Sequence, residues 1–156
     1  MLALVLPEPL TALRSKSGEI DPQDFIQPFG VIYRRVIELR RGGSFLDAGT
    51  CHGFLPLLLA TAQPAGDRSG PAVVGLDIED LLLQAAARFA EQEGISGVEF
   101  VTADLLGPRT ESLPRFDTVT AIHLFEHLDS DAVDHPIKEH GWSWTVDGSG
   151  VAGQRQ

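Results

Sequence analysis

One short segment gathers an acid and three small residues at alternate positions. The acid is Asp47, and Gly49, Cys51 and Gly53 follow it. A glycine-bearing turn between a strand and a helix lets the backbone approach a ligand closely and directs free amide groups at it. Glycines alone would also suit a dinucleotide pyrophosphate, but the charge of Asp47 would repel that group, and the spacing departs from G-x-G-x-x-G. The segment therefore predicts a site for a ligand with positive charge.

Two further acids follow strand-like runs. Asp77 ends the apolar run 72–77, and Asp104 comes after the alternating run 98–102. A carboxylate at a strand end can accept both hydroxyl hydrogens of a ribose, whereas Asp77 read alone would equally serve as a helix cap. Asp104 taken alone is a weaker signal, because Ala-Asp after a strand is common.

Histidines follow a third strand-like run. His123 and His127 come after the run 116–122, and imidazole titrates near neutrality, so both are candidate bases. A metal site built from them with Asp129 is disfavoured, because the segment crosses a strand end and helical spacing cannot be assumed. We predict no metal and assign no catalytic residue, and Asp117 is interpreted as structural.

The elements that position these residues alternate along the chain. Strand patterns separated by helical patterns specify parallel crossovers, so the predicted fold is α/β, a Rossmann-like mostly parallel sheet with flanking helices. The chain divides into an N-terminal lead-in and helix (1–42), a core (43–130) and a divergent tail (131–156). The strands are expected at 44–47, 72–77, 98–102 and 116–122, and the helices at 24–41, or from 28, 54–63 and 80–94.

The tail lacks long apolar runs and is interpreted mainly as a frayed end. Trp142, Trp144 and Val146 nevertheless alternate before Asp147-Gly148, which would suit a hairpin turn. Without a successor, the fourth strand would expose an unpaired edge. We therefore expect either that the segment 142–146 packs near that edge or that the chain self-associates through it.

Taken in order, these motifs resemble those of class I S-adenosylmethionine (SAM) dependent methyltransferases over residues 43–130. The chain is similar to such an enzyme truncated after the fourth strand, since the family sheet has seven. The resemblance implies that the first loop holds the methionine part of SAM, that Asp77 binds the ribose and that Asp104 binds the adenine amino group. Cys51 replaces the family's middle glycine, which makes the turn bulkier. The predicted cofactor-binding residues are Asp47, Gly49, Cys51, Gly53, Asp77, Ile78, Asp104, Leu105 and His123.

The resemblance implies methyl transfer from SAM to a small-molecule acceptor that the sequence does not identify. Two alternatives stay open: a truncated, non-catalytic SAM-binding module, and an NAD-linked oxidoreductase. The formal net charge of -10 disfavours nucleic acid and anionic membrane surfaces as partners. A single cysteine excludes an internal disulfide, and apolar runs are too short to span a bilayer, so we expect a cytoplasmic protein.

Overall fold

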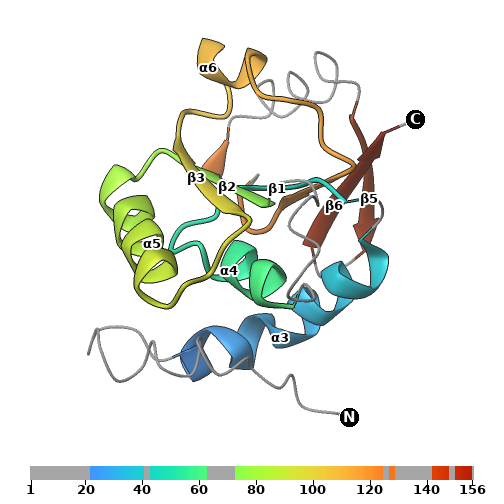
Figure 1. Cartoon of the computed structure of the whole chain (residues 1–156). Helices are drawn as coiled ribbons and strands as arrows, with labels where there is room; N and C mark the ends of the chain where they lie inside the picture. The colour runs from blue at the N-terminus through green and yellow to red at the C-terminus, as the bar shows by residue number, and fades with distance from the viewer. Residues whose placement is uncertain are drawn as a thin grey trace.

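The computed structural model describes residues 22–40, 43–62, 73–124, 127–128, 142–147 and 150–155 (Figure 1). Six strands in these residues form one sheet with the order β3-β2-β1-β4-β6-β5. The first four are mutually parallel, and the last two join as an antiparallel pair. The strands are β1 (Phe45–Ala48), β2 (Val73–Asp77), β3 (Val98–Thr102), β4 (Thr118–Ala121), β5 (Trp142–Asp147) and β6 (Gly150–Arg155).

This arrangement confirms the predicted Rossmann-like α/β class. Helices α4 and α5 lie on one side of the sheet with α3 beyond α4, and α6 lies on the other side (Figure 1). Helix α3 begins earlier than the sequence indicated and continues through Pro28, while α6 is short and was not predicted. The helices are α3 (Pro22–Leu39), α4 (Phe54–Thr61), α5 (Asp80–Gln92) and α6 (Pro108–Glu111).

The strands alternate their side chains between two hydrophobic clusters. Phe45 and Val73 belong to the cluster beneath α4, whereas Leu46 and Val74 belong to the cluster on the opposite face. Neighbouring side chains point to opposite faces of a strand, and a parallel sheet covered on both faces therefore has strands that are apolar throughout. The burial of all four residues of β1 fits that arrangement.

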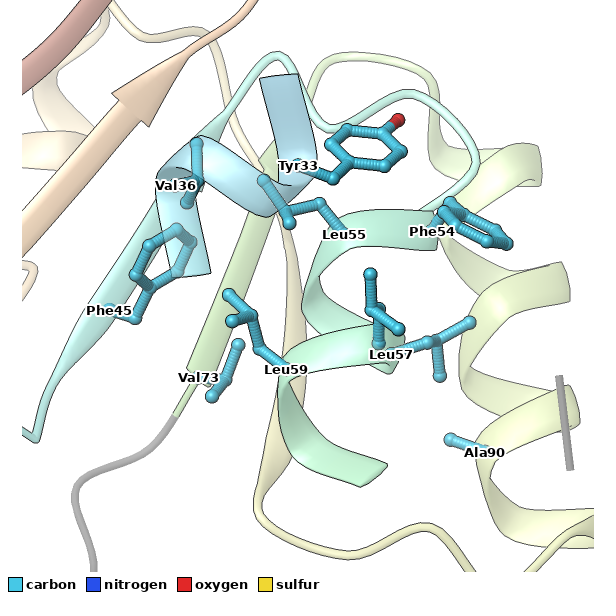
Figure 2. Packing of buried hydrophobic residues seen from close by; sticks show 10 residues of the cluster. Tyr33, Val36, Phe45, Phe54, Leu55, Leu57, Leu59, Val73 and Ala90 are labelled. Carbon is cyan, nitrogen blue, oxygen red and sulfur yellow. The ribbon is translucent and has the colours of Figure 1, made fainter. Parts of the chain in front are cut away.

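Helix α4 is the centre of the first cluster. Every residue from Phe54 to Ala60 is buried, because sheet, α3 and α5 surround this helix. Figure 2 shows Leu59 beside Val73 and Leu57 on the side of Ala90. Since truncating a buried leucine typically costs about 2–5 kcal/mol, this packing anchors α4, and with it the end of the loop that precedes α4, against the sheet.

The hairpin β5–β6 covers the outer edge of β4. Its register pairs Asp147 with Gly150, so the chain forms a hairpin here, with Asp147 in the strand rather than in the turn, and the interpretation as a frayed end is wrong for residues 142–147 and 150–155. The other residues of the predicted tail, 131–141, 148–149 and 156, and with them the position of the turn, lie outside the described residues. The strand next to β4 is β6 rather than the expected segment 142–146, which lies one strand further out. The backbone groups of an edge strand need partners, and here the chain's own hairpin supplies them.

Asp117 links the amino ends of β1 and β4. Its Oδ2 accepts hydrogen bonds from Gly43 N at 3.0 Å, Ser44 N at 2.9 Å and Ser44 Oγ at 2.9 Å. Ser44 Oγ in turn accepts from Asp117 N at 2.8 Å. These contacts confirm that Asp117 is structural, and they hold the pKa of its carboxyl below the ordinary value.

Candidate functional site

A cavity of about 690 Å³ lies at the carboxyl ends of the four parallel strands. Its walls come from the last residues of β1 and β2, from the loops that follow β1, β2, β3 and β4, and from Tyr33 of α3 and Phe54 of α4. Parallel strands end at a common edge of the sheet, which is where ligands bind in open α/β folds. The volume lies within the usual range for small-molecule sites, roughly 300–1,000 Å³.

Eight of the nine predicted residues line this cavity. Asp47, Gly49, Cys51, Asp77, Ile78, Asp104, Leu105 and His123 are all among its walls.

Gly53 is the ninth residue and does not line the cavity. A Cβ atom at this position would collide with the ring of Phe100 on β3, and it would lie 2.9 Å from Ala86 Cβ on α5. The backbone there also has φ +70°, a conformation that favours glycine. Gly53 is thus needed for close packing of the loop against β3 and α5.

The loop after β1 uses its amide groups within the protein. Gly49 N and Thr50 N donate to Leu76 O at 2.8 and 3.0 Å, and Gly53 N donates to Thr50 O at 3.0 Å. Cys51 N donates to Asp77 Oδ2 at 2.7 Å. The expectation that these amides point freely at a ligand is therefore wrong, because the neighbouring end of β2 supplies acceptors within reach.

Cys51 adopts a backbone conformation that suits glycine better. Its φ is +53°, in the left-handed region where a Cβ atom is unfavourable. The side chain is exposed, and its Sγ lies 3.0 Å from His52 Nδ1. Partial burial and the charge of Asp77 raise the pKa of the thiol, so it is not an activated thiolate at neutral pH.

Asp47 is the buried acid of the site, with a residue exposure of 5%. Thr120 Oγ1 of β4 donates a hydrogen bond to its Oδ1 at 2.7 Å. Burial raises the pKa of Asp47 to about 6, and the Asp77 charge adds to this, while the hydroxyls of Thr120 and Thr50 oppose it. Although Thr50 Oγ1 lies near Asp47, it is not in hydrogen-bonding geometry with any group in the described residues.

Asp77 and Asp104 organise the turns that follow β2 and β3. Asp77 Oδ1 accepts from Glu79 N at 3.0 Å while its Oδ2 accepts from Cys51 N, so this side chain links two loops. The residue at the N-cap of α5 is Glu79, which excludes Asp77 as that cap. Asp104 Oδ1 accepts from Leu106 N at 2.9 Å. Carboxylate oxygens have two lone pairs each, so both acids keep capacity for a ligand.

Several walls of the cavity were not predicted. Thr50 and His52 are the intervening residues of the first motif, whose side chains the pattern does not specify. Tyr33 comes from α3, where its ring stacks on Phe54 at 5.7 Å between centroids; burial and the nearby Asp47 charge raise its pKa. The other unpredicted walls are Phe54, Leu76, Glu79, Ala103, Ile122, Leu124 and Leu128, and His127, a predicted base candidate, joins them.

The charged groups around the cavity are unevenly distributed. Asp47, Asp77, Glu79 and Asp104 line it, and among the described residues no lysine or arginine does. Three imidazoles stand at the walls, of which His52 has a pKa lowered by burial. In the described part of the chain, no group of three histidine, cysteine or acidic side chains is placed to hold a metal ion, and no helix is long and apolar enough to cross a membrane.

The parallel sheet and the acidic cavity at its carboxyl edge define a class I SAM-dependent methyltransferase domain. A family model described as a methyltransferase domain matches residues 39–136, and the chain belongs to this family. The match confirms the predicted family and, with it, the predicted cofactor, S-adenosylmethionine. No curated protein matches the sequence significantly.

Solved structures show the same fold. YcgJ from Bacillus subtilis aligns with a TM-score of 0.54 and 20% identity, over 72% of this chain and 44% of that protein. Coclaurine N-methyltransferase, bound to N-methylheliamine and SAH, aligns with a TM-score of 0.57 and 20% identity, over 73% of this chain and 31% of that protein. A third structure is described by the conversion of a disulfide bond into a thioacetal group during echinomycin biosynthesis. It aligns with a TM-score of 0.56 and 30% identity, over 69% of this chain and 42% of that protein. This chain spans less than half the length of each of these proteins.

Proposed function

We propose that the cavity binds SAM and that the protein transfers its methyl group to a small-molecule acceptor. The observation that carries this proposal is the charge of the walls, four carboxylates with no lysine or arginine among the described residues. SAM has a cationic sulfonium and an ammonium group, which such walls attract. The pyrophosphate of NAD would be repelled, so an NAD-linked oxidoreductase is not favoured.

The walls offer a partner for each part of SAM. Asp47 is assigned to the ammonium group of the methionine part, beside Gly49 and Cys51. Asp77 is assigned to the ribose hydroxyls and Asp104 to the adenine amino group, because carboxylates are pure acceptors. Ile78, which is 64% exposed at the rim, and the buried Leu105 provide apolar surface for a flat ring.

SAM supplies an activated methyl group that a nucleophile displaces directly from sulfur. The chain's own contribution is to bind and orient, and to keep water away with walls such as Phe54 and Leu128. His123, at φ +53° just after β4, and His127 line the side of the cavity beyond the fourth strand. Either imidazole could take a proton from the acceptor, and we assign the role of base to neither.

A small acceptor is supported by two observations. The chain's net charge of -10 disfavours nucleic acids. Coclaurine N-methyltransferase, which shares this fold, is bound to N-methylheliamine, a small molecule. The same proposal includes a cytoplasmic location, which is consistent with a single cysteine that is not in a disulfide.

A second candidate is a SAM-binding module without catalytic activity. It is favoured by the strained Cys51 where the family has glycine. Both candidates require SAM to bind, and only the first requires methyl transfer.

Calorimetric titration of the folded protein with SAM, its demethylated product S-adenosylhomocysteine and NAD tests the binding. We expect saturable binding of the first two and none of NAD. Tighter binding of NAD, or no binding of SAM, would refute the proposal. Incubation with methyl-labelled SAM and a panel of small amines, phenols and thiols then separates enzyme from module, because only the enzyme transfers label.

A further inference from the structure

Thr120 and Asp47 form a buried pair across the boundary between β1 and β4. The two residues lie opposite each other in the parallel register of these strands. Thr120 is fully buried, and its Oγ1 is 2.7 Å from Asp47 Oδ1 but 3.4 Å from Leu46 O. A hydroxyl has one hydrogen to donate, and the shorter contact shows that it goes to the carboxylate. One oxygen of Asp47 is therefore held in place.

Thr50 leaves a polar atom unsatisfied at the same point. The residue is 8% exposed and lines the cavity, and its Oγ1 has no hydrogen-bond partner within the described parts of the chain. Buried polar atoms in proteins nearly always have partners, and a lone one calls for an explanation such as an arriving ligand. The hydroxyl can both donate and accept, so an N–H group entering the cavity would satisfy it.

Among the described residues, no lysine or arginine lines the cavity beside Asp47. Tyr33 of α3 lies close enough to interact with it, Cys51 follows in the adjacent loop, and Asp77 lies at the end of β2. Burial and the charge of Asp77 raise the pKa of Asp47 to about 6. A positive charge placed beside this carboxylate would reverse that effect.

We propose that Thr120 is a positioning residue for cofactor binding, which holds Asp47 so that it receives the ammonium group of the ligand's methionine part, and that Thr50 is a further cofactor-binding residue. This inference rests on the proposed function, because it requires SAM in the cavity. Thr120 holds Oδ1, the remaining oxygen of Asp47 accepts from the ammonium group, and the Thr50 hydroxyl accepts a second ammonium hydrogen.

Proton release follows from this arrangement. Below about pH 6 much of the free protein carries a proton on Asp47, and the ammonium group requires the ionised form. Binding then expels that proton from the carboxyl to the buffer, and no other bond changes. Affinity should rise as the pH increases through about 6, and binding at pH 6 should release about half a proton. The ligand's own amine titrates near pH 8, outside this window.

The experiment measures the dissociation constant of S-adenosylhomocysteine by calorimetry from pH 5 to pH 7.5, in two buffers of different ionisation enthalpy. Thr120→Val removes the donor that favours the ionised carboxylate. We expect the midpoint, the pH about which the affinity rises, to move to a higher value in this variant, and its affinity at pH 6 to fall roughly tenfold. Thr120→Ser keeps the hydroxyl and should restore both values.

Thr118→Val is the matched control, because it makes the same change on the same strand at a buried position paired with Phe45, away from the cavity. It should leave the midpoint and the affinity unchanged, whatever it does to stability. Thr50→Val should weaken binding at every pH, and Thr50→Ser should not.

Asp47→Asn identifies the group that titrates, since His52, His123 and His127 also line the cavity. Proton release should disappear in this variant, and release that persists assigns it to a histidine and overturns the inference. A folded Thr120→Val protein with the wild-type midpoint and affinity also overturns it. If Thr120→Val does not fold, Thr120→Ala provides the same comparison. Failure of the wild-type protein to bind at any pH would instead refute the proposed function.

Discussion

Two aspartates on neighbouring strands, Asp47 and Asp117, lie at opposite edges of the sheet and behave in opposite ways. Asp47, in β1 near its carboxyl end, is buried, and burial raises the pKa of its carboxyl to about 6. Asp117 stands just before β4 and is exposed, and backbone and hydroxyl donors of Gly43 and Ser44 lower its pKa. Asp117, which stabilises the fold, lies at the amino ends of the parallel strands (the amino edge of the sheet). Asp47, whose burial costs stability, lies in the cavity at their carboxyl ends (the carboxyl edge).

The difference between the two carboxylates distinguishes a structural role from a role in ligand binding. A carboxylate with enough hydrogen-bond donors stabilises a protein where it stands, whereas a buried carboxylate without a cation is tolerated at a cost. Groups whose pKa is perturbed in this way cluster at functional sites. If the contrast is correct, changes at the carboxyl edge should affect binding and changes at the amino edge should not.

The largest expected effect is that of Asp47→Asn, which should act in opposite directions on stability and on binding. Because the folded-state pKa of Asp47 is raised, the contribution of this carboxyl to stability is fully present below about pH 4 and is lost as the pH rises through about 6. The variant should remove this loss and be more stable at pH 7 by on the order of 2–3 kcal/mol. Its affinity for SAM should fall at least tenfold. Urea unfolding at pH 4 and pH 7, with calorimetry, measures both.

An Asp47→Asn protein that is destabilised at pH 7 would show that the ionised carboxylate has a stabilising partner. That result would remove the contrast between the two edges.

Asp77→Ala should weaken SAM binding by about 1.5–3 kcal/mol, the usual cost of a lost charged hydrogen-bond partner. The variant also loses the contacts to Cys51 N and Glu79 N, so its thermal stability must be measured in parallel. Asp80→Asn is the control, since Asp80 is the adjacent acid outside the cavity walls, bonded to Thr102 Oγ1 at 2.7 Å. An unchanged dissociation constant for a folded Asp77→Ala protein would exclude this acid from the site.

Asp117→Asn should change stability and leave SAM affinity untouched. Because its pKa is lowered in the folded state, the Asp117 carboxylate contributes stability above about pH 4. This contribution is lost as the pH falls through the pKa that Asp117 has in the folded protein. The variant should therefore be less stable than wild type at pH 7 and closer to it at pH 3. Glu99→Gln, an exposed change on β3, controls for the loss of one negative charge. Weaker cofactor binding by Asp117→Asn would contradict the separation of the two edges.

Cys51→Gly is expected to have the smallest effect. Glycine removes the cost of a side chain at φ +53°, so stability should rise by about 1 kcal/mol, and affinity should stay the same or improve. Cys51→Ala keeps the Cβ atom and removes only the thiol, so it should show no such gain. Collapse of binding in both variants would reveal a role for the thiol.

The elements that build the site could be predicted because they rest on local patterns. The runs that form β1 to β4 and the helices α4 and α5 are apolar at spacings that one element imposes by itself. Acids after successive parallel strands must meet at one edge, which is why the sequence alone is enough to place Asp47, Asp77 and Asp104 together. Chain order and residue type determined the carboxyl edge of the sheet.

Contacts between residues distant along the chain were decided only by the tertiary structure. The bond from Thr120 to Asp47 joins residues 73 positions apart, and no local pattern marks either residue as the other's partner. The same holds for Gly53, whose packing against Phe100 and Ala86 takes it out of the cavity. It also holds for β6, which pairs with β4 although its sequence contains two glycines. A residue's type sets which chemistry it can perform, but burial and the atoms around it decide whether it performs that chemistry at a ligand or within the fold, and those come from the assembled sheet.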